Sequence, residues 1–317
     1  MLSEYPVRWK DEWNDLPKDM RHFATTFGPT EGHVLLLGPP GSGKGYLAEI
    51  LHELSPRARG PFVQQNCGAI TESLAEATLF GSMKGAYTGA TESKAGVVEA
   101  ATRGTLFLDE FGALPDATQA MLLIFLEKKE FRRVGSNAVR KADIRVIAAT
   151  NRDLGEALRA GEFRDDLMGR FPLRYEVPPL RERRGEIGGI ADRYFRANGV
   201  ASELTEDAMA RLRSHEWRGN IRELTSVLEY CAVVAKGGLI EVDLVEEGIR
   251  NQGIGMKRSS DEVAKPPKPK SDEEMKRELA EALEATGGNK SEAARSMGID
   301  RRTVYRRLKR YGMGRSE

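Results

Sequence analysis

A chain of 317 residues with 40% hydrophobic and 31% charged residues has the composition of a soluble globular protein with material for about two domains. A formal net charge of +1, two cysteines and no long apolar run exclude a uniformly basic or acidic protein, a disulfide framework and a membrane-spanning helix. The N-terminus has neither the apolar core of a signal peptide nor an arginine-rich transit pattern, so we expect a cytoplasmic protein without a membrane partner.

Short apolar segments alternate with longer amphipathic ones after an N-terminal segment, residues 1–32. The apolar segments are typical of buried strands, and they read HVLLLG, PFVQQNC, GTLFLDE, IRVIAATN and LRYEVPP. Helical patterns such as GYLAEILHEL and ATQAMLLIFLEK lie between them. The alternation predicts an α/β domain over residues 33–179, in which helices flank a largely parallel sheet.

Helical patterns replace the strand patterns after residue 179. They predict a small all-α domain over residues 180–250, in which Thr205 caps one helix. Residues 251–270 are rich in Lys, Pro, Ser and Gly, which predicts a flexible linker. Residues 271–317 then predict a separate domain of three helices.

A glycine-rich stretch, GPPGSGKG, follows the first predicted strand and opens a predicted helix, which is the context that a phosphate-binding loop requires. Glycines let backbone N–H groups converge on phosphate oxygens, and a lysine in this register reaches the β and γ phosphates. The candidate nucleotide-binding residues here are Gly38, Gly41, Ser42, Gly43, Lys44 and Gly45. Gly45 stands where Ser or Thr usually holds Mg²⁺, so the metal would depend on phosphate, water and an acid elsewhere.

Two adjacent carboxylates, Asp109 and Glu110, end the predicted strand TLFLDE and therefore lie at the carboxyl edge of the sheet. We expect Asp109 to hold Mg²⁺ through water and Glu110 to polarise the attacking water. Together with the phosphate loop, this pair predicts a nucleoside-triphosphate hydrolase that uses Mg²⁺.

Several longer segments resemble one family, the AAA+ transcriptional activators of the sigma-54 form of bacterial RNA polymerase. The segments are PFVQQNCGAI, LFGSMKGAYTGA, GTLFLDEFGALP, FLEKKEFRRVGS, ATNRDL, FRDDLMGRF, PPLRERRGEI and WRGNIREL. The resemblance implies an AAA+ fold with a helical lid, ATP as substrate and sigma-54 RNA polymerase as partner. It also implies that a surface loop, usually GAFTGA, contacts sigma-54; here the loop is Gly85, Ala86, Tyr87, Thr88, Gly89 and Ala90.

The resemblance implies further roles near the nucleotide. Asn66 is similar to a switch residue that holds Glu110 until sigma-54 is contacted. Thr150 and Asn151 look like the first nucleotide sensor, and Arg222, in the lid, resembles the second. Each of these positions takes its meaning from the motif around it, because a lone polar residue is more often an ordinary surface group.

Two arginines resemble those that reach into the site of a neighbouring subunit. They are Arg164 and Arg170 in FRDDLMGR. Such an arginine stabilises charge on the phosphoryl group, which is worth about 10³-fold or more in rate in other hydrolases of this kind. The resemblance therefore implies a homo-oligomeric ring, most simply a hexamer, in which subunits complete one another's sites.

The C-terminal stretch GGNKSEAARSMGIDRRTVYRRLKRYG resembles a Fis-type helix-turn-helix. Residues 301–311 hold six Lys and Arg residues and no acid, and we expect a dimer to bind double-stranded DNA at enhancer-like sites. The candidate DNA-binding residues are Arg301, Arg302, Thr303, Arg306 and Arg307. A basic solvated helix is the simpler alternative.

Departures from the family pattern leave two other functions open. Gly45, together with Ser82 and Met83 before the sigma-54 loop, is compatible with a regulator that binds nucleotide and DNA but hydrolyses poorly. An AAA+ protein that remodels a different target is the second alternative. Residues 1–32 are too few for a sensory domain, so we expect control by a separate regulatory protein or by expression level.

Overall fold

The computed structural model describes residues 16–87 and 89–260, together with residues 276–277, 280, 282–283, 286 and 289–290. The chain divides into two compact units, residues 1–252 and residues 253–317. The first unit contains the sheet and the helical lid.

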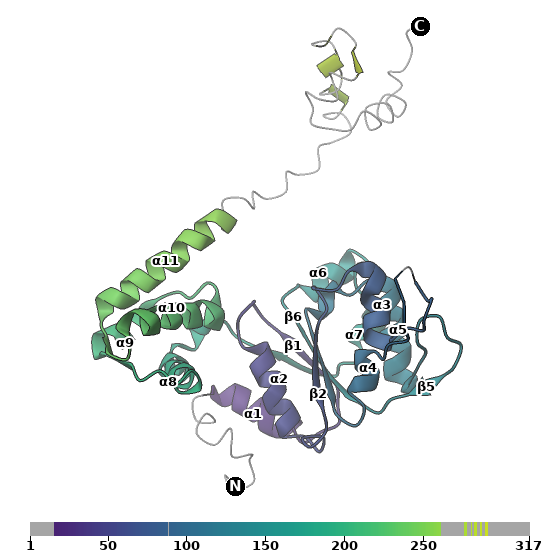
Figure 1. The fold of residues 1–317 in the computed structure, drawn as a ribbon, viewed down its shortest axis with the longest axis horizontal. Helices are drawn as coiled ribbons and strands as arrows, with labels where there is room; N and C mark the ends of the chain where they lie inside the picture. The colour runs from purple at the N-terminus through teal and green to yellow at the C-terminus, as the bar shows by residue number, and fades with distance from the viewer. Residues whose placement is uncertain are drawn as a thin grey trace. The chain divides into compact units, whose positions relative to one another are not determined.

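Five parallel strands form the central sheet in the order β2-β3-β6-β1-β7 (Figure 1). The strands are β1 (Val34–Leu37), β2 (Phe62–Asn66), β3 (Thr105–Asp109), β6 (Arg145–Thr150) and β7 (Leu173–Glu176). The register aligns Leu37 with Thr150 and Asn66 with Asp109, so the strands end together at one edge. All five predicted strands and their parallel arrangement are confirmed.

Helices cover both faces of the sheet (Figure 1). One face carries α1 (Lys18–Phe27) and α2 (Lys44–Glu53). The other carries α3 (Glu72–Phe80), α4 (Val97–Ala100), the 3-10 helix η4 (Phe111–Ala113), α5 (Asp116–Lys128), α6 (Leu154–Arg159) and α7 (Asp165–Met168). A hairpin of β4 (Glu130–Phe131) and β5 (Arg140–Lys141) follows α5. Leu35 and Leu36 enter opposite cores, which explains why the strands are continuous apolar runs.

Helix α1 lies in the N-terminal segment, where the sequence pattern predicts no ordered element. Its apolar side chains are few, but Met20, Phe23 and Ala24 recur at helical spacing and are buried. Phe23 packs against Tyr175 of β7, with ring centroids 4.7 Å apart. The helix is therefore stabilised by the sheet and not by its own composition.

The lid forms its own core around Trp217, which is 1% exposed. Its elements are η5 (Leu180–Glu182), η6 (Arg184–Glu186), α8 (Ile187–Ala197), β8 (Glu203–Leu204), α9 (Glu206–Ser214), α10 (Asn220–Ala235), β9 (Leu239–Ile240) and α11 (Val242–Ser260). The predicted cap is confirmed, because Thr205 Oγ1 accepts a hydrogen bond from the Ala208 N–H at 3.2 Å. The parallel pair of β8 and β9 was not predicted, since two residues are too few to show alternation.

Helix α11 continues through residues 251–260, where the composition predicts an extended linker. Residues 251–260 contain no proline, and the next proline along the chain is Pro266. Every residue of this stretch therefore has the backbone N–H that a helix requires. Within the described part of the chain, no helix combines the length and apolarity needed to span a membrane.

One buried arginine ties the first two helices to the sheet. Arg145, at the start of β6, is 0% exposed and donates to the carbonyls of Phe27 and Gly28 at 2.8 and 2.9 Å. It also donates to Leu51 O in α2 and Gly32 O, each at 3.1 Å. The α1 and α2 carbonyls belong to helix ends, which leave such groups without an intrahelical partner.

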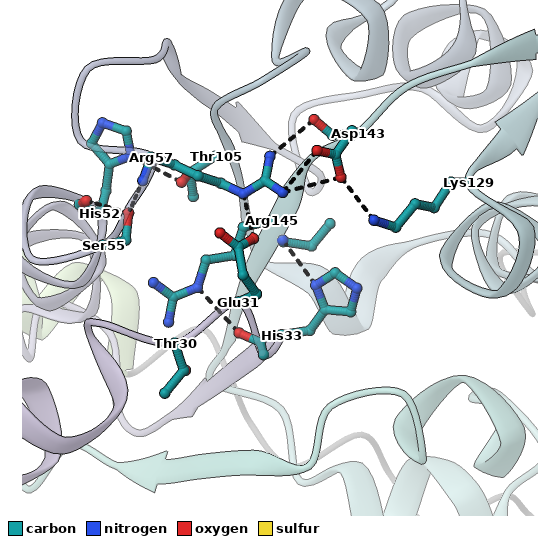
Figure 2. A network of polar contacts seen from close by, with 12 residues as sticks. Thr30, Glu31, His33, His52, Ser55, Arg57, Thr105, Lys129, Asp143 and Arg145 are labelled. Carbon is teal, nitrogen blue, oxygen red and sulfur yellow. Dashed lines mark hydrogen bonds and ion pairs between the residues drawn. The ribbon is translucent and has the colours of Figure 1, made fainter.

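His33 lies beside this arginine at the start of β1 (Figure 2). Its Nδ1 accepts a hydrogen bond from the Val146 N–H at 3.0 Å. Burial lowers the pKa of His33 to about 4, and the positive charge of Arg145 contributes to the shift. The imidazole is therefore neutral in the folded protein at neutral pH.

Lowering the pH is expected to destabilise the fold through His33. The unfolded state takes up a proton near pH 6.5 and the folded state only near pH 4, so stability present above pH 6.5 is lost as the pH falls between these values. The loss is at most about 3 kcal/mol. Urea unfolding at about pH 7 and about pH 4.5 measures it. His33→Asn is expected to reduce the pH dependence and His22→Asn, at a histidine outside the core, to preserve it; equal slopes in all three proteins contradict the assignment.

Candidate functional site

The glycine-rich loop joins β1 to the amino end of α2. Gly38, Gly41 and Gly43 have φ values of 136°, 71° and 97°, a region that side chains rarely permit. Lys44 begins α2 and is 8% exposed, and its Nζ donates to the carbonyls of Gly38 and Pro39 at 2.9 and 3.0 Å. The loop thus presents a helix amino terminus and a buried cation, which together favour anions.

The charges of three other predicted residues act on Lys44 at this loop. Burial lowers the pKa of Lys44, the carboxylates of Asp109 and Glu110 oppose that shift, and Arg222 of the lid adds to it. Glu110 has φ 54°, and its N–H donates to Asp109 Oδ1 at 3.0 Å. The left-handed turn directs the chain away from β3 just after the two carboxylates.

Asn66 and Glu110 both lie beside Gly68. A Cβ on Gly68 would be 1.8 Å from Glu110 Oε2 and 3.4 Å from Asn66 Oδ1, so the glutamate occupies the space that a side chain would fill. Asn66 Oδ1 accepts from the Ala69 N–H at 3.0 Å. The intervening Cys67 is buried, and its N–H donates to Asp109 O at 2.8 Å. The ends of β2 and β3 therefore hold the asparagine and the glutamate as neighbours.

Thr150 ends β6 and Asn151 follows it, at the same edge of the sheet. Thr150 is 1% exposed, and a Cβ on Gly112 in η4 would lie 2.9 Å from its hydroxyl. Asn151 is exposed and lines a cavity of about 510 Å³ together with Gly38 and Pro39. Thr150 thus touches the segment after Glu110, and Asn151 faces the phosphate loop.

Gly45 has room for a side chain. A Cβ at this position would meet only Phe107 Cε1, at 3.7 Å, which is an ordinary contact. Packing therefore does not explain the departure from Ser or Thr.

Two lid residues that no sequence motif singles out also reach the loop. Arg183 is 8% exposed, donates from Nη2 to Ser42 O and pairs through Nη1 with Glu186 at 3.0 Å. Asn220 is 2% exposed and donates from Nδ2 to Pro40 O at 2.9 Å. The only signal in the sequence is their position inside PPLRERRGEI and WRGNIREL, next to residues with clearer roles.

Arg164 and Arg170 lie on the sheet face that carries α5 and α7. Arg164 occupies the N-cap position of α7 and pairs with Asp166 at 2.9 Å, and Arg170 pairs with Glu127 of α5. Their side chains are 36% and 44% exposed. Both guanidinium groups are therefore open to solvent and paired with carboxylates of their own chain.

The hexapeptide at residues 85–90 forms a tight loop whose base is well held. The Gly85 N–H donates to Ala90 O at 2.8 Å, and no atom lies within 4 Å of a Cβ built on Gly85 or Gly89. At the base, Ser82 bridges to Lys94 and Val134, and a Cβ on Gly135 would lie 2.8 Å from Ala86 Cβ. The β4–β5 hairpin thus supports the loop. Tyr87 is half-buried, and Thr88 lies outside the described residues.

The five candidate DNA-binding residues, Arg301, Arg302, Thr303, Arg306 and Arg307, also lie outside the described residues. Their role stays a prediction.

The strand order, the phosphate loop, the acidic end of β3 and the helical lid together define an AAA+ fold. The family model of the Sigma-54 interaction domain matches residues 14–174, that of the AAA+ ATPase lid domain matches residues 181–262, and that of the Bacterial regulatory protein, Fis family, matches residues 275–311. The chain belongs to the family of sigma-54-dependent transcriptional regulators.

Curated relatives agree with this placement. The chain is 39% identical over 296 residues to the alginate biosynthesis regulatory protein AlgB of Pseudomonas aeruginosa, covering 92% of this chain and 64% of AlgB. It is 38% identical over 317 residues to the regulatory protein AtoC of Escherichia coli, covering 94% and 66%. The chain thus spans about two thirds of the length of these relatives.

Solved structures show the same architecture. NtrX from Brucella abortus in complex with ATP aligns with a TM-score of 0.65 at 30% identity, covering 93% of this chain and 67% of NtrX. A point mutant of RuvB from Thermotoga maritima aligns with a TM-score of 0.51 at 18% identity, covering 98% of this chain and 90% of RuvB, and supports the fold alone.

Proposed function

We propose that this protein is an ATP-dependent transcriptional activator that binds DNA upstream of a promoter and remodels the closed complex of sigma-54 RNA polymerase through its GAYTGA loop. The observation that carries the proposal is the convergence of Lys44, Asp109, Glu110 and Arg222 on the phosphate loop, in a chain whose Sigma-54 interaction domain also holds the hexapeptide.

The residues at the loop fit ATP hydrolysis. The helix amino terminus and Lys44 bind the β and γ phosphates, and Glu110 accepts a proton from the attacking water. Asp109 is the acid available for Mg²⁺, through water, because Gly45 offers no ligand. Mg²⁺, when bound, neutralises charge on the phosphate oxygens. Thr150 and Asn151 report the state of the γ-phosphate from the end of β6.

Asn66 links hydrolysis to the partner. It lies next to Glu110 across Gly68, where a small shift of the asparagine changes which groups the glutamate contacts. In our proposal, Asn66 restrains Glu110 until the GAYTGA loop has engaged sigma-54.

The exposed arginines support a ring, with a hexamer as the proposed form. Arg164 and Arg170 lie on the sheet face opposite α2, so a neighbouring subunit's nucleotide is the more natural target than their own. Their carboxylate partners are solvent-accessible, and exchanging such a pair for a phosphate has a small energetic cost.

The C-terminal segment, residues 271–317, supplies the contact with DNA in this proposal. The Fis-family match over residues 275–311 includes the basic segment with Arg301 and Arg302, which we propose to bind double-stranded DNA as a dimer. A separate regulatory protein is proposed to control the activator. A protein with these partners acts in the cytoplasm, on the nucleoid when it is bound to DNA.

The function is tested by capture of purified sigma-54. We expect a complex with ADP and aluminium fluoride, which together mimic the transferring phosphoryl group, and no complex with ADP alone. Thr88→Ala is expected to abolish capture, whereas Thr91→Ala, just outside the hexapeptide, is the matched control that preserves it. Bound nucleotide without capture contradicts the proposal and favours either the regulator with impaired hydrolysis or a remodeller of another target.

A further inference from the structure

Three consecutive carbonyl groups of the phosphate loop are held by the lid. Pro40 O accepts from Asn220 Nδ2 at 2.9 Å, and Gly41 O accepts from the Ile221 N–H at 2.9 Å. Ser42 O accepts from Arg183 Nη2. The donors come from the amino end of α10 and from the segment between η5 and η6, so the lid grips the loop along one side.

This grip determines where the amide groups of the loop point. In a trans peptide unit the C=O and the following N–H point in opposite directions. Holding the carbonyls of residues 40, 41 and 42 toward the lid therefore holds the N–H groups of residues 41, 42 and 43 away from it. Converging N–H groups of this kind form the concavity that binds phosphate.

Asn220 is the residue that connects the grip to the rest of the lid. Its Oδ1 accepts from the Leu180 N–H at 2.8 Å while its Nδ2 donates to Pro40 O. A side-chain amide accepts through its oxygen and donates through its nitrogen, so one short side chain makes both bonds. Asn220 also has φ 55°, a left-handed conformation that asparagine tolerates better than most residues.

The loop and α10 are in direct contact at this point. A Cβ on Gly41 would lie 2.6 Å from Gly219 O and 3.1 Å from Arg222 Cβ. Arg222 belongs to the same first turn of α10 as Asn220, so any movement of this turn displaces the loop and the second sensor together.

We propose that Asn220 is a positioning residue for the phosphate loop, holding the N–H groups of Gly41 and Gly43 ready for the β-phosphate and coupling their orientation to the lid. The inference rests on the proposed nucleotide-binding function. It implies a selective effect: the affinity for nucleotides that carry a β-phosphate depends on Asn220, whereas the affinity for adenosine does not.

Asn220→Asp tests this selectivity in the whole 317-residue chain. Aspartate keeps the size, the tolerance of the left-handed backbone and the acceptor for the Leu180 N–H, but it places an oxygen against Pro40 O. We expect the Kd for ADP and for ATP to rise about tenfold or more, consistent with the loss of a buried hydrogen bond. Adenosine, measured by competition at high concentration, is expected to bind unchanged.

Two further variants separate the possible outcomes. Asn198→Asp makes the same charge change at an exposed lid asparagine and is expected to bind ADP like the wild type. In Asn220→Gly, the glycine adopts the left-handed backbone conformation and adds no charge. It is expected to lose affinity for ADP and ATP but not for adenosine, like Asn220→Asp. Agreement of the two variants shows that the loss is not caused by misfolding of Asn220→Asp.

The results distinguish failure of the inference from failure of the proposed function. If the wild type binds neither ADP nor ATP, the proposed function itself is overturned. If the wild type binds ADP and both Asn220 variants bind it equally well, the inference is overturned. Parallel loss of adenosine and ADP affinity, with a lower Tm, also overturns it, because that pattern indicates a purely structural role.

Discussion

Glu110→Gln is expected to reduce ATP turnover by about 10²–10⁴-fold while leaving the Kd for ADP unchanged. Glutamine fills the same space beside Gly68 but accepts no proton from water. The substitution leaves Lys44 and the amino end of α2 in place, so phosphate binding is expected to be preserved. Steady-state phosphate release and nucleotide titration measure the two quantities.

Glu72→Gln is the matched control, because Glu72 is exposed at the start of α3. It is expected to hydrolyse ATP like the wild type. If the wild type turns over ATP no faster than Glu110→Gln, the ATPase assignment is contradicted. That result favours the regulator in which Gly45 has removed productive hydrolysis. A parallel loss of turnover and ADP affinity instead assigns Glu110 to the architecture of the site.

Arg145→Met is expected to lower the free energy of unfolding by about 3–5 kcal/mol. The substitution leaves the carbonyls of Gly28 and Leu51 without their donor, whereas Phe27 O still accepts from Thr30. Each buried unsatisfied carbonyl costs about 1–3 kcal/mol before relaxation and water entry. The ends of α1 and α2 lose their connection to β6. Urea unfolding followed by circular dichroism measures the change.

Arg196→Met in α8 is the control, since Arg196 is exposed and donates to Asp192 O within its own helix, at 3.4 Å. We expect a change within about 0.5 kcal/mol there. Similar small effects for both variants contradict the role of Arg145 as the buried tie between helices and sheet.

The strands and most helices were predictable because their signals are local. HVLLLG and IRVIAATN are continuous apolar runs, as expected for strands covered on both faces, and Leu35 and Leu36 do enter opposite cores. The structure adds α1, which was not predicted because its three buried side chains are covered only when the helix packs against β7. Likewise, β8 and β9 are too short for any periodic pattern.

The candidate site was predictable where a residue type and a motif coincide. Lys44 in a glycine-rich loop and the two carboxylates that end TLFLDE meet in the structure, as their place at the ends of parallel strands requires. Arg183 and Asn220 were missed because their function is to bond carbonyls of Ser42 and Pro40, and no sequence pattern reports backbone acceptors far along the chain.

By itself, the sequence determined the classes of element, the phosphate loop, the acidic strand end and the family, because each depends on residues close together along the chain. Only the tertiary structure decided which carbonyls Arg145 and Asn220 satisfy, that Glu110 fills the space above Gly68, and that the lid grips the phosphate loop. Those contacts join segments that are distant in sequence. Most of them involve backbone carbonyl groups, which every residue has, so no pattern of residue types marks them.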